Sequence, residues 1–362
     1  MRLGSGFGSR DDGSHAGSAI YVKRSPAPAD MASGSAVGKQ GRRLLKSARR
    51  GFGMQLTVAC AAMVIAAIAA APASAADTIR GYSYAETAPR NAPEDQLTAG
   101  RLACPSGKPV VGGGVDSSGG FNDPMMIYSS RPYDGQDSDS IPEDGWDAQV
   151  DRLFGSSAQS IKVYRICDTL KSASSYAYSK KTVSVGEGTQ GTVSVPCPNG
   201  HPVVGGGVAS TGGSVARMWV HSSGPYDGSD TDTLQDDGWR ASVANVSSDD
   251  PFAHNVTAYA ICDKTRPQSA YSYLKKTVPV AENAQVRADV LCATSSQVVV
   301  GGGVSANGDY DDKVFVNTSR PTDGTDIDTI EDDGWRAAVD NSEGIVSDHT
   351  ANLVTVYAIC RR

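Results

Sequence analysis

The sequence has 362 residues, and its 40 aspartates and glutamates outnumber its 33 lysines and arginines, for a formal net charge of −7. Ten of the basic and three of the acidic residues lie in positions 1–76, so positions 77–362 hold 23 basic and 37 acidic residues, a formal charge of −14. Because such a surface repels nucleic acid and anionic membranes, the composition argues against either as a partner.

The first 76 residues have the pattern of a segment that is removed on export. Residues 1–40 are rich in glycine, serine and alanine, and we expect them to be disordered or to follow from a start codon set too early. Residues 41–76 hold a basic stretch, an apolar stretch and small residues before a cleavage site at Ala75 or Ala76. This order is typical of a signal peptide.

The apolar stretch of this signal, Val58 to Ala71, is too short to span a membrane. It has about 14 residues, whereas a spanning helix needs roughly 20. No later stretch is apolar for as long. We therefore expect a mature protein that is secreted, extracellular and without a membrane span.

The rest of the chain repeats one unit three times. Each unit has a cysteine, a Val-Gly-Gly-Gly-Val motif, an acidic loop that ends in Gly-Trp, and a final Tyr-x-Ile-Cys motif. The equivalent tryptophans are Trp146, Trp239 and Trp335, which lie 93 and 96 residues apart. Repetition at a fixed period indicates one structural unit copied along the chain. The predicted boundaries of the three units are 77–170, 171–264 and 265–362.

Two cysteines belong to each unit. An even number of cysteines in an exported chain indicates disulfides, and the equal placement within the units favours pairing inside each unit. A bridge that closes a loop of about 65 residues stabilises a unit by roughly 4 kcal/mol on the chain-entropy model. The predicted pairs are Cys104–Cys167, Cys197–Cys262 and Cys292–Cys360.

The local pattern of each unit is that of β-strands. In the stretch from Trp239 to Val246, apolar and polar residues alternate, and glycine, aspartate and proline punctuate the chain between such stretches. Each unit shows about six strands and no long amphipathic helix. The predicted fold is all-β, with three tandem antiparallel sandwich-like repeats of ~93 residues, each with one disulfide. One integrated pseudo-threefold body is the alternative.

The triple glycines 112–114, 205–207 and 301–303 do not fit a phosphate-binding loop, because no helix and no lysine follow them. Glycine inside a strand marks a bulge or a close approach of another group. We expect a bulky neighbour, such as the tryptophan of the same unit, to stack over these glycines. Trp239 lies on the apolar face of its strand with Ala241 and Val243, which predicts a core position.

The acidic loop contains Asp-Gly-x-Asp-x-Asp in each unit, with a further aspartate before Gly-Trp. Alternating carboxylates in a flexible loop are suitable ligands for Ca²⁺, although the spacing is not that of an EF-hand. The competing interpretation is a solvated turn in which aspartate side chains bond backbone amides. The candidate Ca²⁺ ligands are Asp134, Asp137, Asp139, Asp227, Asp230, Asp232, Asp323, Asp326 and Asp328, with Asp144, Asp237 and Asp333 beside them.

Signals for catalysis are weak in this sequence. Its histidines after the leader, His201, His221, His254 and His349, do not recur at equivalent positions in the three units. Three nearly identical catalytic loops in tandem would be unusual, so we expect the protein not to be an enzyme. A secreted hydrolase with its site in one unit and a protease inhibitor remain alternatives. Trp219, present in one unit only, is a candidate for stacking on a sugar.

The pattern Cys-Pro-x-Gly-x-x-Val-x-Gly-Gly with Asp-Gly-Trp resembles a repeat module of exported actinobacterial proteins. The Cys-Pro-x-Gly motif, together with Asp348, Thr350, Ala351, Asn352 and Cys360, is also similar to the vitelline membrane outer layer protein family. That resemblance implies a single threefold β-prism and a role in an extracellular coat or in association with glycans. It covers about a fifth of each unit and implies no catalytic residue.

These observations favour a secreted, disulfide-stabilised protein that acts as a structural or binding module. Three copies of a weak site on one chain bind a repetitive ligand multivalently. The expected ligand is an extracellular polysaccharide or a cell-wall polymer.

Overall fold

The computed structural model describes residues 77–135, 139–155, 157–213, 217–228, 230, 232–246, 252–307, 314–324, 328–342 and 352–362. The expected leader, including Ala75 and Ala76, lies outside these ranges, as do Asp137, Asp326 and His349. So do Asp348, Thr350 and Ala351 of the family resemblance. Within the described ranges, no helix has the length and apolar character needed to cross a bilayer.

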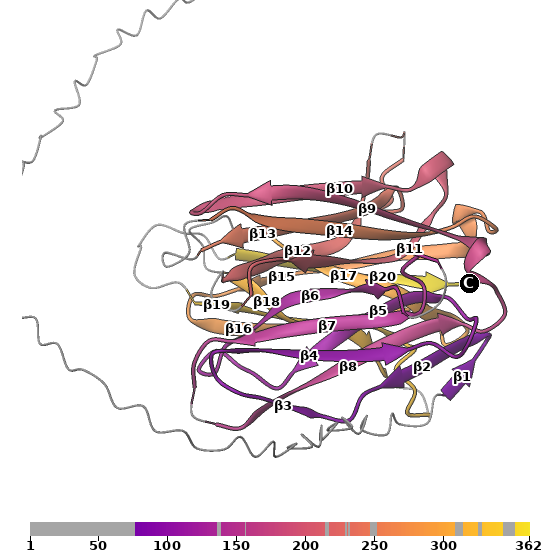
Figure 1. The fold of residues 1–362 in the computed structure, drawn as a ribbon. Coiled ribbons are helices and arrows are strands. Elements are labelled where there is room, and N and C mark those ends of the chain that lie inside the picture. Colours follow the sequence, from indigo (N-terminus) through magenta and orange to yellow (C-terminus); the bar gives the residue numbers. More distant parts are fainter. Residues whose placement is uncertain are drawn as a thin grey trace, which may run out of the picture. The chain divides into compact units, whose positions relative to one another are not determined.

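Strands make up most of the described chain, and the short helices there are 3₁₀ turns (Figure 1). The first repeat forms β1 (Asp77–Ile79), β2 (Tyr82–Glu86), β3 (Arg90–Ala92), β4 (Gln96–Ala103), β5 (Val110–Ser117), β6 (Met125–Tyr133), β7 (Gly145–Arg152) and β8 (Gln159–Asp168).

The second and third repeats each form six strands in the same order. The second has η1 (Ala173–Ser175), β9 (Tyr176–Val185), β10 (Thr189–Pro196), η2 (Pro198–Gly200), β11 (Val203–Ser210), β12 (Met218–Tyr226), β13 (Gly238–Asn245) and β14 (His254–Asp263). The third has η4 (Gln268–Ala270), β15 (Tyr271–Val280), β16 (Ala284–Leu291), β17 (Val298–Ala306), β18 (Val314–Thr322), β19 (Gly334–Asn341) and β20 (Asn352–Arg361).

The strands form three antiparallel sheets, and each sheet combines strands from two repeats. Two sheets have six strands, in the orders β4-β7-β6-β11-β14-β9 and β10-β13-β12-β17-β20-β15. The third has eight, in the order β1-β2-β8-β5-β18-β19-β16, with β3 also pairing with β8. The joints are short, because β6 and β11 pair at only two positions, and so do β12 and β17. The repeats are therefore linked in a closed cycle, first to second, second to third and third to first.

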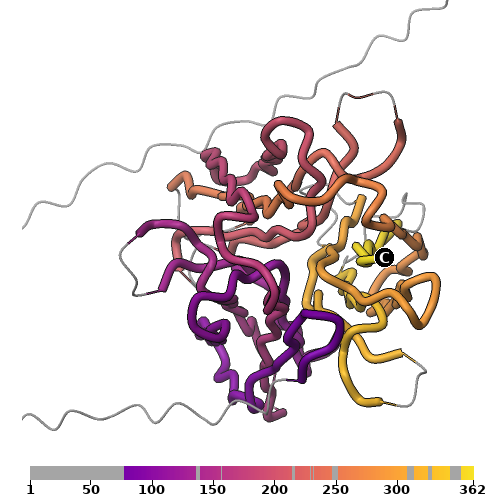
Figure 2. The backbone as a smooth tube through the Cα atoms, turned by 90° about the vertical axis from the view of Figure 1, so that its right-hand side faces the viewer, coloured from indigo at the N-terminus to yellow at the C-terminus, as the bar shows by residue number. Residues whose placement is uncertain are grey.

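Within each repeat, the strands divide into two layers, and these layers pack face to face. In the second repeat, β10 packs on β9 and β14, and β13 packs on β14 and β11. Each repeat is thus a small sandwich, and Figure 2 shows the three repeats as three colour groups, indigo to magenta, crimson to salmon, and orange to yellow. The predicted all-β fold of antiparallel sandwich-like repeats is confirmed. In addition, continuous sheets join the three repeats to one another, as the alternative of one integrated threefold body expected.

The three disulfides pair as predicted, one in each repeat. The bonded cysteines lie 63, 65 and 68 residues apart in sequence, with Cα–Cα distances of 5.9, 5.8 and 5.8 Å. In the first repeat, Cys104 follows β4 and Cys167 lies in β8. Because β4 and β8 belong to different sheets, the bridge ties the two layers of the sandwich together.

The triple glycines allow close approach in two directions. A Cβ on the middle glycine, such as Gly113, would collide with the ring of Trp146 from the same repeat. A Cβ on the first glycine, such as Gly112, would collide with the carbonyl of Val300 in a neighbouring repeat. The tryptophan is buried, with 1% of its surface exposed, and its Nε1 donates to Ser130 Oγ at 3.0 Å. The expected stacking of tryptophan on glycine is therefore what the structure has, in all three repeats.

A cluster of buried tyrosines and aspartates connects consecutive repeats. Tyr176 donates to Asp168 Oδ2 at 2.6 Å, and Tyr271 donates to Asp263 Oδ2 at 2.5 Å. Arg266 lies between the two carboxylates, with Nη1 3.1 Å from Asp263 and 3.5 Å from Asp168. We call these five residues the tyrosine–aspartate cluster. The guanidinium of Arg266 is thus the positive charge next to both carboxylates, whose side chains are 0–1% exposed.

Candidate functional site

The aspartate before each Gly-Trp pair closes the acidic loop on itself. Its Oδ2 accepts a hydrogen bond from the glycine amide nine residues earlier, at 2.5, 2.6 and 2.8 Å in the three repeats. The pairs are Asp144 with Gly135, Asp237 with Gly228, and Asp333 with Gly324. These bonds fix the base of the loop at the edge of the Gly-Trp strand.

The last aspartate of each Asp-x-Asp pair also accepts a hydrogen bond from the backbone. Asp139, Asp232 and Asp328 each accept the amide hydrogen two residues later, at 2.7, 2.7 and 2.8 Å. This is the turn geometry that short carboxylate side chains adopt. Among the remaining predicted ligands, Asp134 and Asp230 are exposed, and Asp227 and Asp323 are half-buried. The turn interpretation therefore accounts for part of the acidic motif.

In the second repeat, the carboxylates also gather in space. One oxygen each of Asp227, Asp230 and Asp237 lie within 4.8 Å of one another, and so do oxygens of Asp230, Asp232 and Asp236. We call these five residues the five-aspartate cluster. Burial, together with the charges of Asp232, Asp237 and Asp230, raises the pKa of Asp236 to about 6. Asp236 was not among the residues that the sequence singled out.

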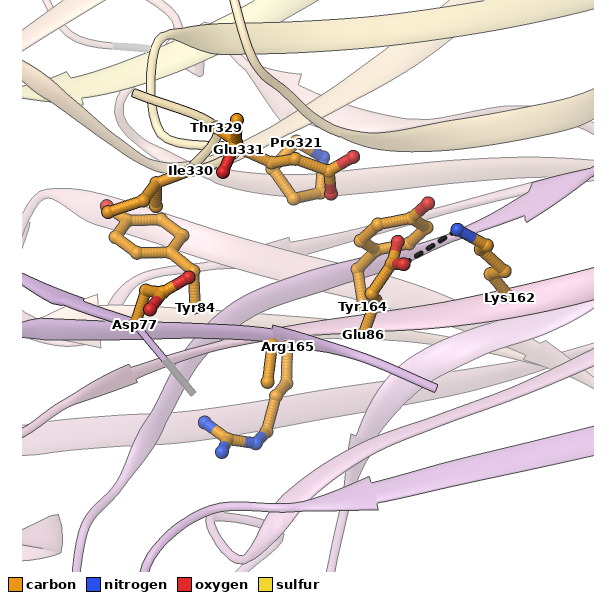
Figure 3. A pocket seen from close by; sticks show the side chains of 11 residues that line it. Asp77, Tyr84, Glu86, Lys162, Tyr164, Arg165, Pro321, Thr329, Ile330 and Glu331 are labelled. Atoms are coloured by element: carbon orange, nitrogen blue, oxygen red, sulfur yellow. Dashed lines mark hydrogen bonds and ion pairs between the residues drawn. The ribbon is translucent and has the colours of Figure 1, made fainter. Parts of the chain in front are cut away.

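A pocket of about 290 Å³ lies on the seam between the first and third repeats (Figure 3). Tyr84 and Tyr164 come from the first repeat, whereas Pro321 and Glu331 come from the third. The side chain of Arg165 points away from the tyrosine rings in Figure 3, and its Nη1 instead contacts Cys167 Sγ at 3.0 Å.

Two of the carboxylates that line this seam pocket form ion pairs. Lys162 Nζ lies 2.6 Å from Glu86 Oε1, and Arg320 Nη1 lies 2.8 Å from Glu331 Oε1. Burial raises the pKa of Glu331 to about 7, although Arg320 opposes this shift. Arg320 also stacks over the ring of Tyr164, 5.1 Å from its centroid. Each ion pair lies within one repeat, but Arg320 of the third repeat contacts the first repeat through Tyr164 and through Asp116 Oδ2, 3.3 Å from its Nε. The pocket is therefore better explained as a joint between repeats than as a ligand site.

A larger groove, of about 660 Å³, forms where all three repeats meet. Equivalent positions of β6, β12 and β18 contribute a buried apolar cluster of Met126, Trp219 and Phe315, and these three strands pack against one another. The rings of Trp219 and Phe315 have centroids 5.5 Å apart. We call this the aromatic groove. The described residues that line it are Phe121, Asn122, Pro124, Leu153, Phe154, Arg217, Trp219, Val246, Phe315 and Ser342.

The aromatic groove combines an apolar floor with groups that can form hydrogen bonds. Trp219 forms part of the floor, with 9% of its surface exposed and its Nε1 buried, whereas the amide of Asn122 and the guanidinium of Arg217 line the groove. Phe154 is 55% exposed at the same groove. Arg217 is also exposed and has a backbone φ of +42°, a region that L residues rarely adopt and that is frequent at functional sites. Such a lining suits a ligand that has both an apolar face and hydroxyl groups.

The candidate stacking residue, Trp219, therefore lies at this groove, but as part of its floor. The exposed aromatic side chain is Phe154, which sequence analysis missed. The sequence did contain a signal for the buried floor of the groove. Met125, Met126 and Ile127 form an unbroken apolar run in β6, and β12 has a similar run. A strand with one solvent face alternates, so such a run indicates burial on both faces.

His221 is 0% exposed. It follows Val220 at a bulge of β12, and Tyr128 and Asn317 occupy the equivalent bulges of β6 and β18. A side chain without access to solvent cannot take a proton from a substrate in this conformation. His221 is therefore best explained as a residue of the packed interior.

No family model matches the sequence, and no curated protein is significantly similar to it. The described residues form a disulfide-stabilised all-β protein that fits an extracellular environment, and the aromatic groove is an apolar recess of about 660 Å³.

Proposed function

We propose that this chain is a secreted, non-catalytic binding protein whose aromatic groove takes up a sugar unit of an extracellular polysaccharide or cell-wall polymer. The observation that carries the proposal is the composition of the groove: exposed Phe154 lines the same recess as Trp219 and the polar side chains of Asn122 and Arg217. A pyranose ring offers an apolar face for the aromatic ring and hydroxyls for the polar side chains.

The polar residues around the groove support the same ligand class. Asn122, Arg217 and Ser342 line it, and their amide, guanidinium and hydroxyl groups form hydrogen bonds with sugar hydroxyls. The formal charge of −14 in positions 77–362 disfavours polymers rich in phosphate or uronate. The proposed ligand is therefore an uncharged polysaccharide.

The proposed location outside the cell rests on two independent features. The sequence has the pattern of a signal peptide before position 77, and the three disulfides persist in oxidising compartments. The groove draws on all three repeats, so binding there requires the assembled chain and not a single repeat. This differs from the sequence-based hypothesis of three separate weak sites.

The test is retention of residues 77–362 on a panel of insoluble polysaccharides and isolated cell walls. We expect retention on at least one neutral polymer, with affinity reduced about fivefold or more in Phe154→Ala, since a stacked ring contributes on the order of 1 kcal/mol. Phe252→Ala is the matched control, because Phe252 is 70% exposed and does not line the groove.

Two results would contradict the proposal. Equal retention of Phe154→Ala and the unchanged protein would show that the groove is not the binding site. No retention on any polymer would reject polysaccharides as the ligand class. Release of soluble sugar during the same incubations would instead favour a hydrolase and reject the non-catalytic role.

A further inference from the structure

The five-aspartate cluster is built around a shared residue. Asp230 belongs to both groups of close carboxylates, with Asp227 and Asp237 in one and with Asp232 and Asp236 in the other. Carboxylates whose oxygens lie within 4.8 Å of one another repel each other, and a cation among them relieves this repulsion. Crowded carboxylates alone are common on protein surfaces, so a second observation is needed.

Asp236 supplies that observation. It is only 7% exposed, and its Oδ1 is buried without a hydrogen-bond partner. A carboxylate oxygen of the same residue lies within 4.8 Å of oxygens from Asp230 and Asp232. A buried carboxylate oxygen that has no donor is costly, and a metal ion at the cluster would remove that cost.

We propose that the five-aspartate cluster binds one Ca²⁺ ion, with Asp230 and Asp236 as central ligands. The inference is separate from the proposed function, because none of these residues lines the aromatic groove. It concerns the second repeat, since Asp137 and Asp326, the equivalents of Asp230, lie outside the described residues.

The hydrogen bonds of the loop prepare the site and leave oxygens available for an ion. Asp237 Oδ2 accepts from Gly228, and Asp232 Oδ2 accepts from Gln268 Nε2 at 2.9 Å. Gln268 begins η4 in the third repeat, so this contact ties the loop to a neighbouring repeat. Partly fixed ligands lose less conformational entropy when they bind. An ion here would hold the loop and the adjoining repeat together.

The chemistry of the ligands favours Ca²⁺. All five side chains offer carboxylate oxygens, which hard cations prefer, and no histidine or cysteine belongs to either group. Ca²⁺ accepts six to eight oxygens in irregular arrangements, whereas Mg²⁺ requires near-octahedral geometry. A loop with carboxylates at irregular positions therefore fits Ca²⁺ better.

The experiment is calorimetric titration of residues 77–362 with CaCl₂ after removal of metal by chelation. We expect saturable binding with a dissociation constant of about 1 mM or below, the range of extracellular calcium modules. In Asp236→Asn, which keeps the side-chain size, the affinity should fall at least tenfold or one binding event should disappear. Glu187→Gln removes the same charge from an exposed position outside the cluster and should bind as the unchanged protein does.

Thermal unfolding provides a readout that a purely structural aspartate would not give. With a chelator present, Asp236→Asn should melt at the same or a higher temperature than the unchanged protein, because it lacks the unpartnered charge. With saturating CaCl₂, the order should reverse. The proposal is overturned if Ca²⁺ produces no heat and no melting shift up to about 10 mM, or if Asp236→Asn binds Ca²⁺ with unchanged affinity and stoichiometry.

Discussion

The tyrosine–aspartate cluster and the five-aspartate cluster both gather carboxylates but differ in their counter-charge. In the first, Arg266 lies within 3.5 Å of Asp168 and Asp263, and two tyrosine hydroxyls donate to the same carboxylates. In the second, buried Asp236 has an oxygen without a partner. The chain supplies its own cation where two repeats are connected, whereas in the second cluster the proposed Ca²⁺ would supply the positive charge.

The largest effect is expected from removing the internal cation. Arg266→Met should lower the free energy of unfolding by about 3–5 kcal/mol, because it leaves two buried carboxylates uncompensated. Denaturant unfolding of residues 77–362 measures this. A double substitution, Arg266→Met with Asp263→Asn, should recover part of the loss. A loss below about 1 kcal/mol for the single variant would show that the tyrosines alone suffice.

Removing one carboxylate from each cluster should change stability differently in the presence of a chelator. Asp263→Asn should destabilise the protein by about 1–3 kcal/mol, because it weakens charge-assisted bonds to Tyr271 and Arg266. Asp236→Asn should leave stability equal or raise it. Matched unfolding curves in EDTA compare the two variants. Destabilisation by both variants would mean that the two clusters do not differ in the way described.

Stability should also depend on pH through carboxyl groups that burial keeps protonated. Burial raises the pKa of Glu331 to about 7 and that of Asp340 to about 6, both above the values of unfolded chains. The folded state therefore binds more protons than the unfolded state between about pH 4 and 7, and stability is lost as the pH rises through these values.

We expect the free energy of unfolding to be about 1–3 kcal/mol lower at pH 8 than at pH 5, measured in chelator. Asp340→Asn should reduce this dependence, and its neighbour Asn317 can still donate to the new amide oxygen. A stability that rises from pH 5 to 8 would contradict the assigned direction.

The smallest effect is expected at an exposed ion pair. Arg101 lies opposite Asp147 on β4 and β7, with Nη2 2.8 Å from Oδ2, but 56% of the arginine side chain is exposed. Arg101→Ala should cost less than about 1 kcal/mol, because water and salt screen such pairs. Denaturant midpoints at low and high salt measure this. If Arg101→Ala lowered the free energy of unfolding as much as Arg266→Met, burial would not explain why the two arginines differ in their contribution to stability.

Sequence analysis predicted the strands and disulfides of this fold because their signals are local. The Gly-Trp strand of the second repeat, for example, alternates from Trp239 to Val243, and β13 runs from Gly238 to Asn245. The cysteines pair within the repeats because the two layers of a sandwich bring each pair together. Each signal lies within one repeat, so three copies gave the same prediction.

The candidate sites were only partly predictable. Asp230 and Asp232 were singled out by their spacing, but Asp236, which has the unpartnered oxygen, looked like an ordinary loop residue. Phe154 and Arg217 belong to different repeats and meet only at the aromatic groove. No pattern within one repeat could indicate that meeting.

The sequence alone determined the strand content, the repeat period and the cysteine pairing, because each depends on residues within one copy of the unit. The tertiary structure decided how the copies join, which carboxylate is buried and where aromatic side chains from three copies meet. These features depend on strand pairing between repeats, as where Ser129 and Ser130 of β6 lie beside β11. Such contacts leave no periodic trace in the sequence, because any exposed strand edge offers the same backbone hydrogen bonds.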